Sequence, residues 1–204
     1  MTQRIVSVLF LISSLWLVSC TPTVNHSKRM DSNKTVHTIL NRKSVRSYAK
    51  KLVEKEKVDT LLRAAMSAPT AVNKQPWAFV VIDNPQILEK LSTSLPYAKM
   101  AASAPMAIVV CGDLNKTLRG QDDPYWPLDC SAASENLLLA AESMGLGAVW
   151  TAVYPEKDRM EIVSEILSLP EYIVPFNLIP VGYPKHPEEP KDKFKEENIH
   201  YNQW

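Results

Sequence analysis

The chain has no excess of charge of either sign, since its 204 residues include 23 lysines and arginines and 22 aspartates and glutamates. This balance predicts no nucleic-acid partner, because nucleic-acid-binding proteins carry basic patches. Only three cysteines occur and none forms a CxxC pair, so a cysteine-rich metal or redox site is excluded. The four histidines have no partner four residues away, which disfavours a zinc site.

The motifs of the common catalytic machineries are also missing. Gly145-Leu146-Gly147 is not a dinucleotide fingerprint, because it follows a predicted helix and Trp150 stands where the third glycine belongs. A Rossmann site is therefore disfavoured. There is no GxSxG motif and no recognisable pair of acid and base. A site without these groups fits chemistry that a cofactor supplies.

The first twenty residues differ in composition from the rest of the chain. Arg4 gives a short basic start, residues 5–18 form an apolar run, and Leu17-Val18-Ser19-Cys20 ends it with small residues. The run predicts a secretory signal and is too short to favour a spanning helix. Its end resembles a bacterial lipobox, which predicts a signal peptide over 1–19 and lipidation of Cys20. A plain signal peptide and an uncleaved anchor are the alternatives.

With a lipid on Cys20, residues 20–34 form a polar tether and residues 35–204 form the folded domain. We expect such a protein in the cell envelope, anchored to a bacterial membrane outside the cytoplasm. The two other thiols, Cys111 and Cys130, lie in apolar stretches and are predicted to be buried. A disulfide between them is the alternative outside the cytoplasm.

Helical and strand patterns alternate along the domain. Apolar residues at helical spacing predict helices over 53–66, 129–144 and 156–167, around 87–91, and one that ends at Asn41 after N-cap candidates at 32–35. Short apolar runs predict strands over 78–82, 107–111, 147–153 and 172–181. Pro175 and Pro180 interrupt the last of these, so we expect an edge strand or a bulge there.

The predicted helix 129–144 is the central one, because it is apolar on nearly all sides. Such a helix is buried in the core or at a subunit interface. Asp129 or Ser131 is the expected N-cap, after a loop over 121–127, and Gly145 is expected to end the helix.

The segment 42–48 carries candidate anion-binding groups. In an extended chain Arg42, Ser44 and Arg46 share a face, so two guanidinium groups and a hydroxyl lie together. Planar guanidinium donors match phosphate oxygens in pairs. The pattern predicts an anion clamp, and a solvated basic loop is the alternative.

The segment 68–77 joins a predicted helix to a predicted strand between Pro69 and Pro76. Between these two rigid points lie three side chains that both donate and accept hydrogen bonds, Thr70, Asn73 and Gln75. Such a loop can bind the edge of a planar heterocycle. A helix-stopping turn with solvated polar residues is the alternative.

Four segments together resemble the FMN-dependent nitroreductase family: residues 42–48, 68–77 and 129–150, and 181–184 with the end 200–204. The resemblance covers residues 36–204 in the family's order. It implies an α+β fold with a mixed sheet flanked by helices, in an intertwined homodimer with two FMN sites at the interface. The chain would then be a bacterial lipoprotein member of that family. Its aromatic end also predicts that the tail docks on a surface.

The resemblance implies roles for individual residues. Phosphate and ribityl contacts fall on Arg42, Lys43, Ser44 and Arg46. Contacts from the neighbouring subunit to the flavin edge fall on Thr70, Asn73 and Gln75. Backbone groups that would face the flavin ring lie at Thr151 and Ala152. The basic residue that would reach the phosphate from the tail is Lys191 or Lys193.

The activity that the resemblance implies is a ping-pong transfer of hydride or electrons from NAD(P)H to a nitroaromatic, quinone or activated alkene. The flavin carries this chemistry, and no catalytic side chain or metal ion is expected. Because nicotinamide cofactors are scarce outside the cytoplasm, a protein or quinol donor is the alternative to NAD(P)H. Two other functions remain open: a flavin-binding lipoprotein without turnover, and a dehalogenase-like or flavin-cleaving member of the superfamily.

Overall fold

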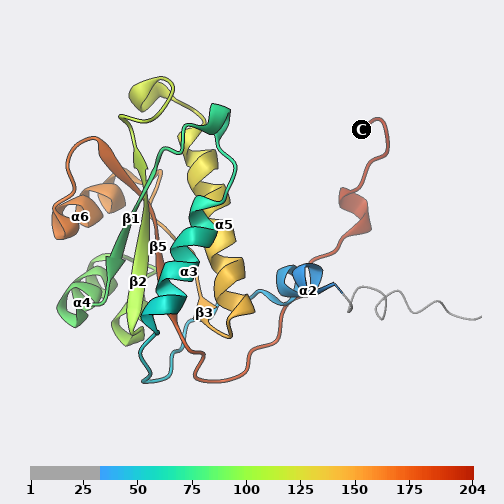
Figure 1. Cartoon of the computed structure of the whole chain (residues 1–204), viewed down its shortest axis with the longest axis horizontal. Coiled ribbons are helices and arrows are strands. Elements are labelled where there is room, and N and C mark those ends of the chain that lie inside the picture. The colour runs from blue at the N-terminus through green and yellow to red at the C-terminus, as the bar shows by residue number, and fades with distance from the viewer. Residues whose placement is uncertain (1–32) are drawn as a thin grey trace, which may run out of the picture.

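The computed structural model describes residues 33–204 (Figure 1), so the predictions for the signal peptide and for Cys20 lie outside the described residues. The helices are α2 (Lys34–Asn41), α3 (Lys55–Met66), α4 (Pro85–Ser94), α5 (Trp126–Ser143) and α6 (Lys157–Leu167). The strands are β1 (Trp77–Ile82), β2 (Met106–Asp113), β3 (Gly147–Ala148), β4 (Thr151–Ala152) and β5 (Ile173–Gly182). Short 3-10 helices are η1 (Ala71–Asn73), η2 (Lys99–Ser103), η3 (Gly120–Asp122) and η4 (Glu196–Asn198). None of the described helices is both long and apolar enough to cross a membrane.

The five strands form one sheet in the order β1-β2-β5-β3, with β4 also paired to β5. All of these strand pairs are antiparallel. A mixed sheet was expected. The parallel pairing in the described residues is an isolated bridge between Ser44 and Ala148. Helices α3 and α5 cover one face of the sheet, and α4 and α6 cover the other (Figure 1). The predicted α+β class is confirmed.

Strand β2 shows why the core has two layers. Its side chains alternate, so Ile108 and Val110 pack toward α3 and α5, whereas Val109 and Cys111 pack toward α4 and α6. All of β2 is buried, as expected for a strand covered on both faces. Cys130 lies on the α5 side, opposite to Cys111, and both thiols are free. Their predicted burial is therefore confirmed, and the alternative of a disulfide is wrong.

Strand β5 is central, so the expectation of an edge strand is wrong. β2 pairs with one side of it and β3 and β4 with the other. The alternative, a bulge, is confirmed: Val110 pairs with Asn177 and Cys111 with Pro175, which leaves Phe176 as the extra residue. A bulge accommodates the missing amide of a proline inside a sheet. The predicted strand 147–153 is divided into β3 and β4.

Helix α5 begins earlier than predicted, because Pro127 occupies its first turn, where a proline amide is not needed. The expected N-cap roles of Asp129 and Ser131 are therefore wrong. The Asp129 carboxylate instead accepts the amide of Ala71, and the Ser131 hydroxyl donates to the Pro127 carbonyl. The predicted end is confirmed, since Gly145 has φ 71°.

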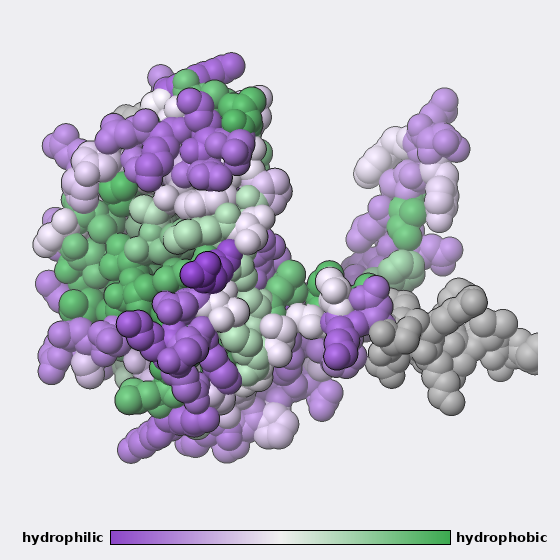
Figure 2. Space-filling model, in the orientation of Figure 1, coloured by the Kyte–Doolittle hydropathy of each residue, from purple (hydrophilic) through white to green (hydrophobic). Residues whose placement is uncertain are grey.

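The tail after β5 leaves the body of the molecule as a separate arm (Figure 2). Its large side chains are exposed, with Phe194 74%, Tyr201 83% and Trp204 100% accessible. The aromatic end of the tail was expected to dock on a surface. In the part of the chain that the structure describes, it does not dock on the domain to which it belongs.

Candidate functional site

A basic cavity of about 380 Å³ lies where the segment after α2 meets the start of the tail. Its lining includes the four predicted residues of segment 42–48 and both predicted tail lysines, namely Arg42, Lys43, Ser44, Arg46, Lys191 and Lys193. The fold thus brings together six residues that are up to 151 positions apart in the sequence. Glu188 and Glu189 also line the cavity and were not predicted.

Close packing on β3 positions the basic segment. The Val45 amide donates to the Ala148 carbonyl at 3.0 Å, and the Val45 side chain is buried. Gly147 permits this approach, because a Cβ on it would lie 2.6 Å from the Val45 Cβ. Val45 therefore points into the core while its neighbours Ser44 and Arg46 line the cavity.

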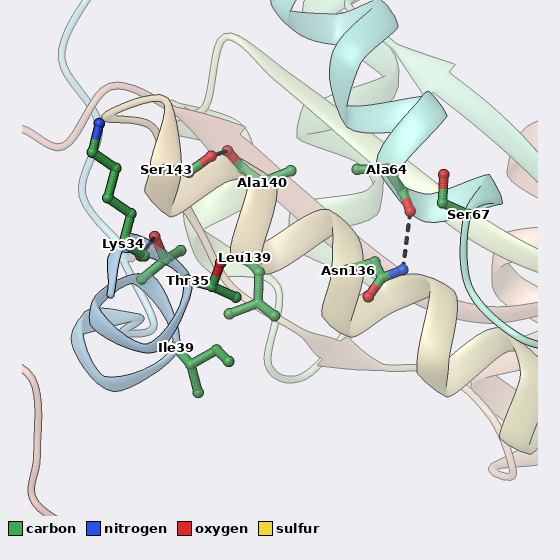
Figure 3. Close-up of a pocket in the computed structure, with 10 residues that line it drawn as sticks. Lys34, Thr35, Ile39, Ala64, Ser67, Asn136, Leu139, Ala140 and Ser143 are labelled. Carbon is green, nitrogen blue, oxygen red and sulfur yellow. Dashed lines mark hydrogen bonds between the residues drawn. The ribbon is translucent and has the colours of Figure 1, made fainter. Parts of the chain in front are cut away.

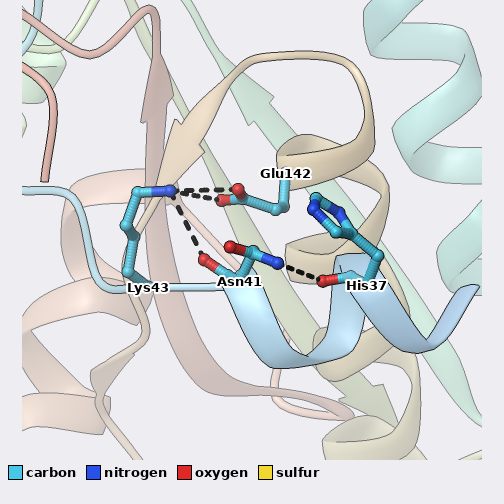
Figure 4. A network of polar contacts seen from close by, with 4 residues as sticks. All are labelled: His37, Asn41, Lys43 and Glu142. Carbon is cyan, nitrogen blue, oxygen red and sulfur yellow. Dashed lines mark hydrogen bonds and ion pairs between the residues drawn. The ribbon is translucent and has the colours of Figure 1, made fainter. Parts of the chain in front are cut away.

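Two of the cations in this cavity have carboxylate partners on α5. Arg42 Nε lies 2.9 Å from Glu135 Oε1, and Lys43 Nζ lies 3.0 Å from Glu142 Oε1. Figure 4 shows Lys43 donating to both Glu142 oxygens and to the carbonyl of Asn41 at the end of α2. These bonds fix the directions of the two side chains and offset part of their charge.

Arg46 differs from these two cations. Its guanidinium group donates to the Ser44 carbonyl at 3.3 Å, and within the described residues no carboxylate lies within the 4.0 Å ion-pair distance of it. Its charge is therefore available to an external anion. The predicted shared clamp is thus unequal, because Arg42 is already ion-paired and Arg46 is not.

A second cavity of about 470 Å³ adjoins the first one at Arg46, which lines both. Its wall consists of the segment before and in η2 and the segment around β4, namely Pro96, Tyr97, Lys99, Met100, Val149, Trp150, Thr151 and Ala152. The Trp150 ring packs edge-on against Phe176, with centroids 5.4 Å apart, which fixes this wall. The predicted residues Thr151 and Ala152 are thus brought to the same site as Arg46.

Thr151 carries an unusual polar group at this wall. The residue is 4% exposed, and among the described residues its hydroxyl oxygen has no hydrogen-bond partner. A buried hydroxyl without a partner is costly, and such groups are rare in native proteins.

The loop of Thr70, Asn73 and Gln75 lies at the other end of α5. The Ala71 amide binds Asp129 in the first turn of α5, whereas Lys43 binds Glu142 in the last turn. Thirteen residues at 1.5 Å per residue separate these points by about 20 Å. One chain therefore does not bring this loop to the basic cavity, and its expected role toward a neighbouring subunit stays a prediction.

Sequence reasoning missed several residues of the site. Tyr97 and Lys99 gave no signal, because only the tertiary fold brings η2 next to β4. Glu135 and Glu142 did carry one: they lie seven positions apart on one face of α5, and they are its acidic residues after the first turn. An acidic pair of this kind indicates a basic partner, and the segment 42–48 supplies it.

A third hollow of about 480 Å³ lies between α2, α3 and α5 (Figure 3). Asn136 bridges α5 and α3 at its floor by donating to the Ala64 carbonyl at 3.1 Å. Ile39 and Leu139 give it apolar sides, and Ile39 is 51% exposed.

In the part of the chain that the structure describes, no group of three histidine, cysteine or acidic side chains is placed to hold a metal ion.

The sequence matches the model of the nitroreductase family over residues 39–96 and 92–183. A protein of Methanothermobacter thermautotrophicus, provisionally named NADH dehydrogenase/NAD(P)H nitroreductase, is 42% identical over 183 residues, which cover 89% of this chain and 94% of that protein. The FMN reductase (NADPH) of Bacillus subtilis is 28% identical over 191 residues, which cover 82% of this chain and 75% of that protein.

Solved structures resemble the fold as well. A crystal structure from Parabacteroides distasonis, provisionally named NADH dehydrogenase/NAD(P)H nitroreductase, matches with a TM-score of 0.80 and 54% identity over 84% of this chain and 99% of that one. The FMN-dependent nitroreductase from Clostridium difficile R20291 matches with a TM-score of 0.74 and 27% identity over 82% and 98% of the two chains.

Proposed function

The chain belongs to the nitroreductase family, and from this premise we propose that it passes hydride or electrons to a nitroaromatic, quinone or activated alkene by a ping-pong mechanism. It is an oxidoreductase with FMN as cofactor and NAD(P)H as electron donor. When bound, FMN supplies a ring that accepts a hydride and passes electrons on. The observation that carries the proposal is the position of Arg46, which lines both the basic cavity and the second cavity.

The two adjoining cavities fit the two ends of FMN. The basic one offers cations for a phosphate, and the other offers flat apolar walls for a ring. We propose phosphate and ribityl contacts for Arg42, Lys43, Ser44 and Arg46, with Lys191 or Lys193 reaching the phosphate.

The residues of this chain hold the cofactor and do not react with it. Glu135 and Glu142 keep Arg42 and Lys43 in fixed directions, so these cations need little reordering when a phosphate arrives. The packing of Trp150 on Phe176 holds one side of the second cavity in place. Backbone groups of Thr151 and Ala152 lie at the same wall, where we propose that they face the ring.

We propose that a homodimer completes this site. The aromatic end of the tail, with Tyr201 and Trp204, is exposed on its own chain, and the hollow between α2, α3 and α5 offers apolar sides that it could cover on a second copy. The loop that carries Asn73 and Gln75 lies about 20 Å from the basic cavity of its own chain. We propose that a partner subunit brings this loop to the flavin edge.

Steady-state kinetics test the ping-pong proposal. Initial rates at varied NADH or NADPH and several fixed acceptor concentrations should give parallel double-reciprocal lines, because donor and acceptor use the same site in turn. Intersecting lines would show that both substrates are bound together. Retention of FMN without turnover of any donor and acceptor pair would favour the alternative of a flavin-binding lipoprotein.

We also propose that the mature chain begins at a lipidated Cys20 and is anchored to a membrane of the cell envelope, as the sequence Leu17 to Cys20 suggests. The wild-type chain should partition into a detergent phase. Cys20→Ala should release it or leave the precursor unprocessed, because the acceptor thiol is gone. Cys111→Ala is the matched control and should leave partitioning unchanged. Normal processing and membrane retention of the Cys20 variant would rule out the lipid anchor.

A further inference from the structure

The loop from Thr70 to Gln75 has a backbone conformation that its residues do not favour. Val72, Asn73 and Gln75 have positive φ angles of 42°, 57° and 52°. None of them is a glycine, and positive φ is least favourable for a β-branched residue such as Val72. Strained backbone of this kind persists only where surrounding contacts fix it, and it is found mostly at functional sites.

Asp129 makes the contact that ties this loop to the body of the protein. Asp129 is 6% exposed, and its Oδ1 accepts a hydrogen bond from the Ala71 amide at 3.0 Å. Ala71 is the first residue of η1, so the bond holds the start of the strained segment. A second bond, from the Gln75 amide to Thr70 Oγ1 at 3.1 Å, closes the loop on itself.

The fixed loop presents a defined pair of polar groups to the outside. Gln75 Nε2 donates to Asn73 Oδ1 at 3.1 Å, and both residues are exposed. This bond leaves the Asn73 amide nitrogen as a donor beside the Gln75 carbonyl oxygen as an acceptor. A donor next to an acceptor matches a heterocycle edge in which a carbonyl stands beside an N–H, as in the imide part of a flavin.

We propose that Asp129 is a positioning residue of the cofactor site. By holding the Ala71 amide, it keeps the loop in the strained shape that sets the Asn73 and Gln75 amides side by side against the flavin imide. This inference rests on the proposed FMN function. It adds to that function a buried residue that never touches the ligand and acts through the loop.

The test compares FMN with 3-methyl-FMN, in which a methyl group replaces the imide hydrogen. Dissociation constants for both are measured for the wild type, Asp129→Ala and Asp129→Asn. We expect Asp129→Ala to weaken FMN binding about tenfold or more, the loss that one charge-assisted hydrogen bond corresponds to. Its effect on 3-methyl-FMN should be smaller, because that ligand keeps a carbonyl for the Asn73 amide but has no imide N–H for the Gln75 carbonyl. Asp129→Asn should recover most of the FMN affinity, since its amide oxygen still accepts the Ala71 amide.

Two further variants separate positioning from support of the fold. Ala71→Pro removes the donor and leaves Asp129 in place; Thr70 has φ −137° and ψ 157°, a conformation that suits a residue before proline. It should reproduce the selective loss of FMN affinity, even if Asp129→Ala does not fold. Asp123→Ala is the matched control: Asp123 is 4% exposed and accepts the amides of Leu118 and Tyr125 in the neighbouring loop. It should lower stability without changing the ratio of the two dissociation constants.

Equal losses for FMN and 3-methyl-FMN in Asp129→Ala and Ala71→Pro would mean that Asp129 supports the fold alone, and would overturn the proposal. The proposal also fails if Asp123→Ala changes the ratio of the FMN and 3-methyl-FMN dissociation constants as much as Asp129→Ala does. It fails as well if the wild type binds FMN and neither Asp129→Ala nor Ala71→Pro alters that binding. A wild-type chain that binds no FMN would instead overturn the proposed function itself.

Discussion

Arg46→Ala should weaken FMN binding by roughly ten- to more than a hundredfold, because a charge-assisted hydrogen bond contributes about 1.5 to 3 kcal/mol. Arg46 lines both cavities, and within the described residues it has no carboxylate partner, so its charge is available to the phosphate. Lysine at this position should restore only part of the affinity, since a point charge replaces a two-pronged donor.

Riboflavin lacks the phosphate and should respond far less to the same substitution. The measurement is therefore a comparison of FMN and riboflavin dissociation constants in wild type and Arg46→Ala. Arg119→Ala, which removes an exposed arginine from the loop before η3, is the matched control and should change neither constant. Equal losses for both ligands would place Arg46 at the ring and not at the phosphate, and the phosphate assignment would have to be abandoned.

Deletion of Glu196 to Trp204 should weaken the proposed homodimer and lose FMN with it. The deleted part contains Tyr201 and Trp204, which are 83% and 100% exposed on the isolated chain. Obligate interfaces commonly bury more than about 2,000 Å², and they are more apolar than transient ones. Lys191 and Lys193 remain in the shortened chain, so a loss of FMN would report the loss of the partner subunit and not of the tail lysines.

Light scattering and flavin content measured on the same samples decide this prediction. The double variant Tyr201→Ser/Trp204→Ser keeps the length and charge of the tail and should show a smaller shift in the same direction. Dilution of the wild type alone should not separate the subunits. A monodisperse monomer that retains FMN at micromolar concentration would contradict both the dimer and the composite site.

The elements that the sequence predicted well are those whose apolar period is regular. The predicted ranges 53–66 and 156–167 differ from α3 and α6 by two residues or fewer at each end. Such periods follow directly from the faces that must be buried. Local rules were incomplete at prolines: Pro127 opens α5, which was predicted to begin later, and the bulge beside Pro175 was predicted but the central place of its strand was not. Both outcomes depend on partners that are distant in the sequence.

The residues of the candidate site also divide into those that a local sequence pattern predicts and those that only the tertiary fold brings together. Segment 42–48 could be found from its own pattern of cations, and the structure brings it to the tail lysines. Tyr97 and Lys99 could not be found, since no local pattern shows that η2 packs beside β4. The pattern of the apolar run predicts Asp129 or Ser131 as a helix cap, whereas the partner of Asp129 is the Ala71 amide of another segment.

The most direct test of the account is the visible spectrum of the purified chain without its first 20 residues, followed during anaerobic addition of NADH and then NADPH. We predict a yellow protein with one FMN per chain, whose flavin absorbance is lost on addition of at least one nicotinamide and returns when a nitroaromatic or quinone is added. A colourless protein that takes up no added FMN would contradict the central claim that the two cavities joined at Arg46 form a flavin site. A flavin that neither nicotinamide reduces would contradict the assigned donor.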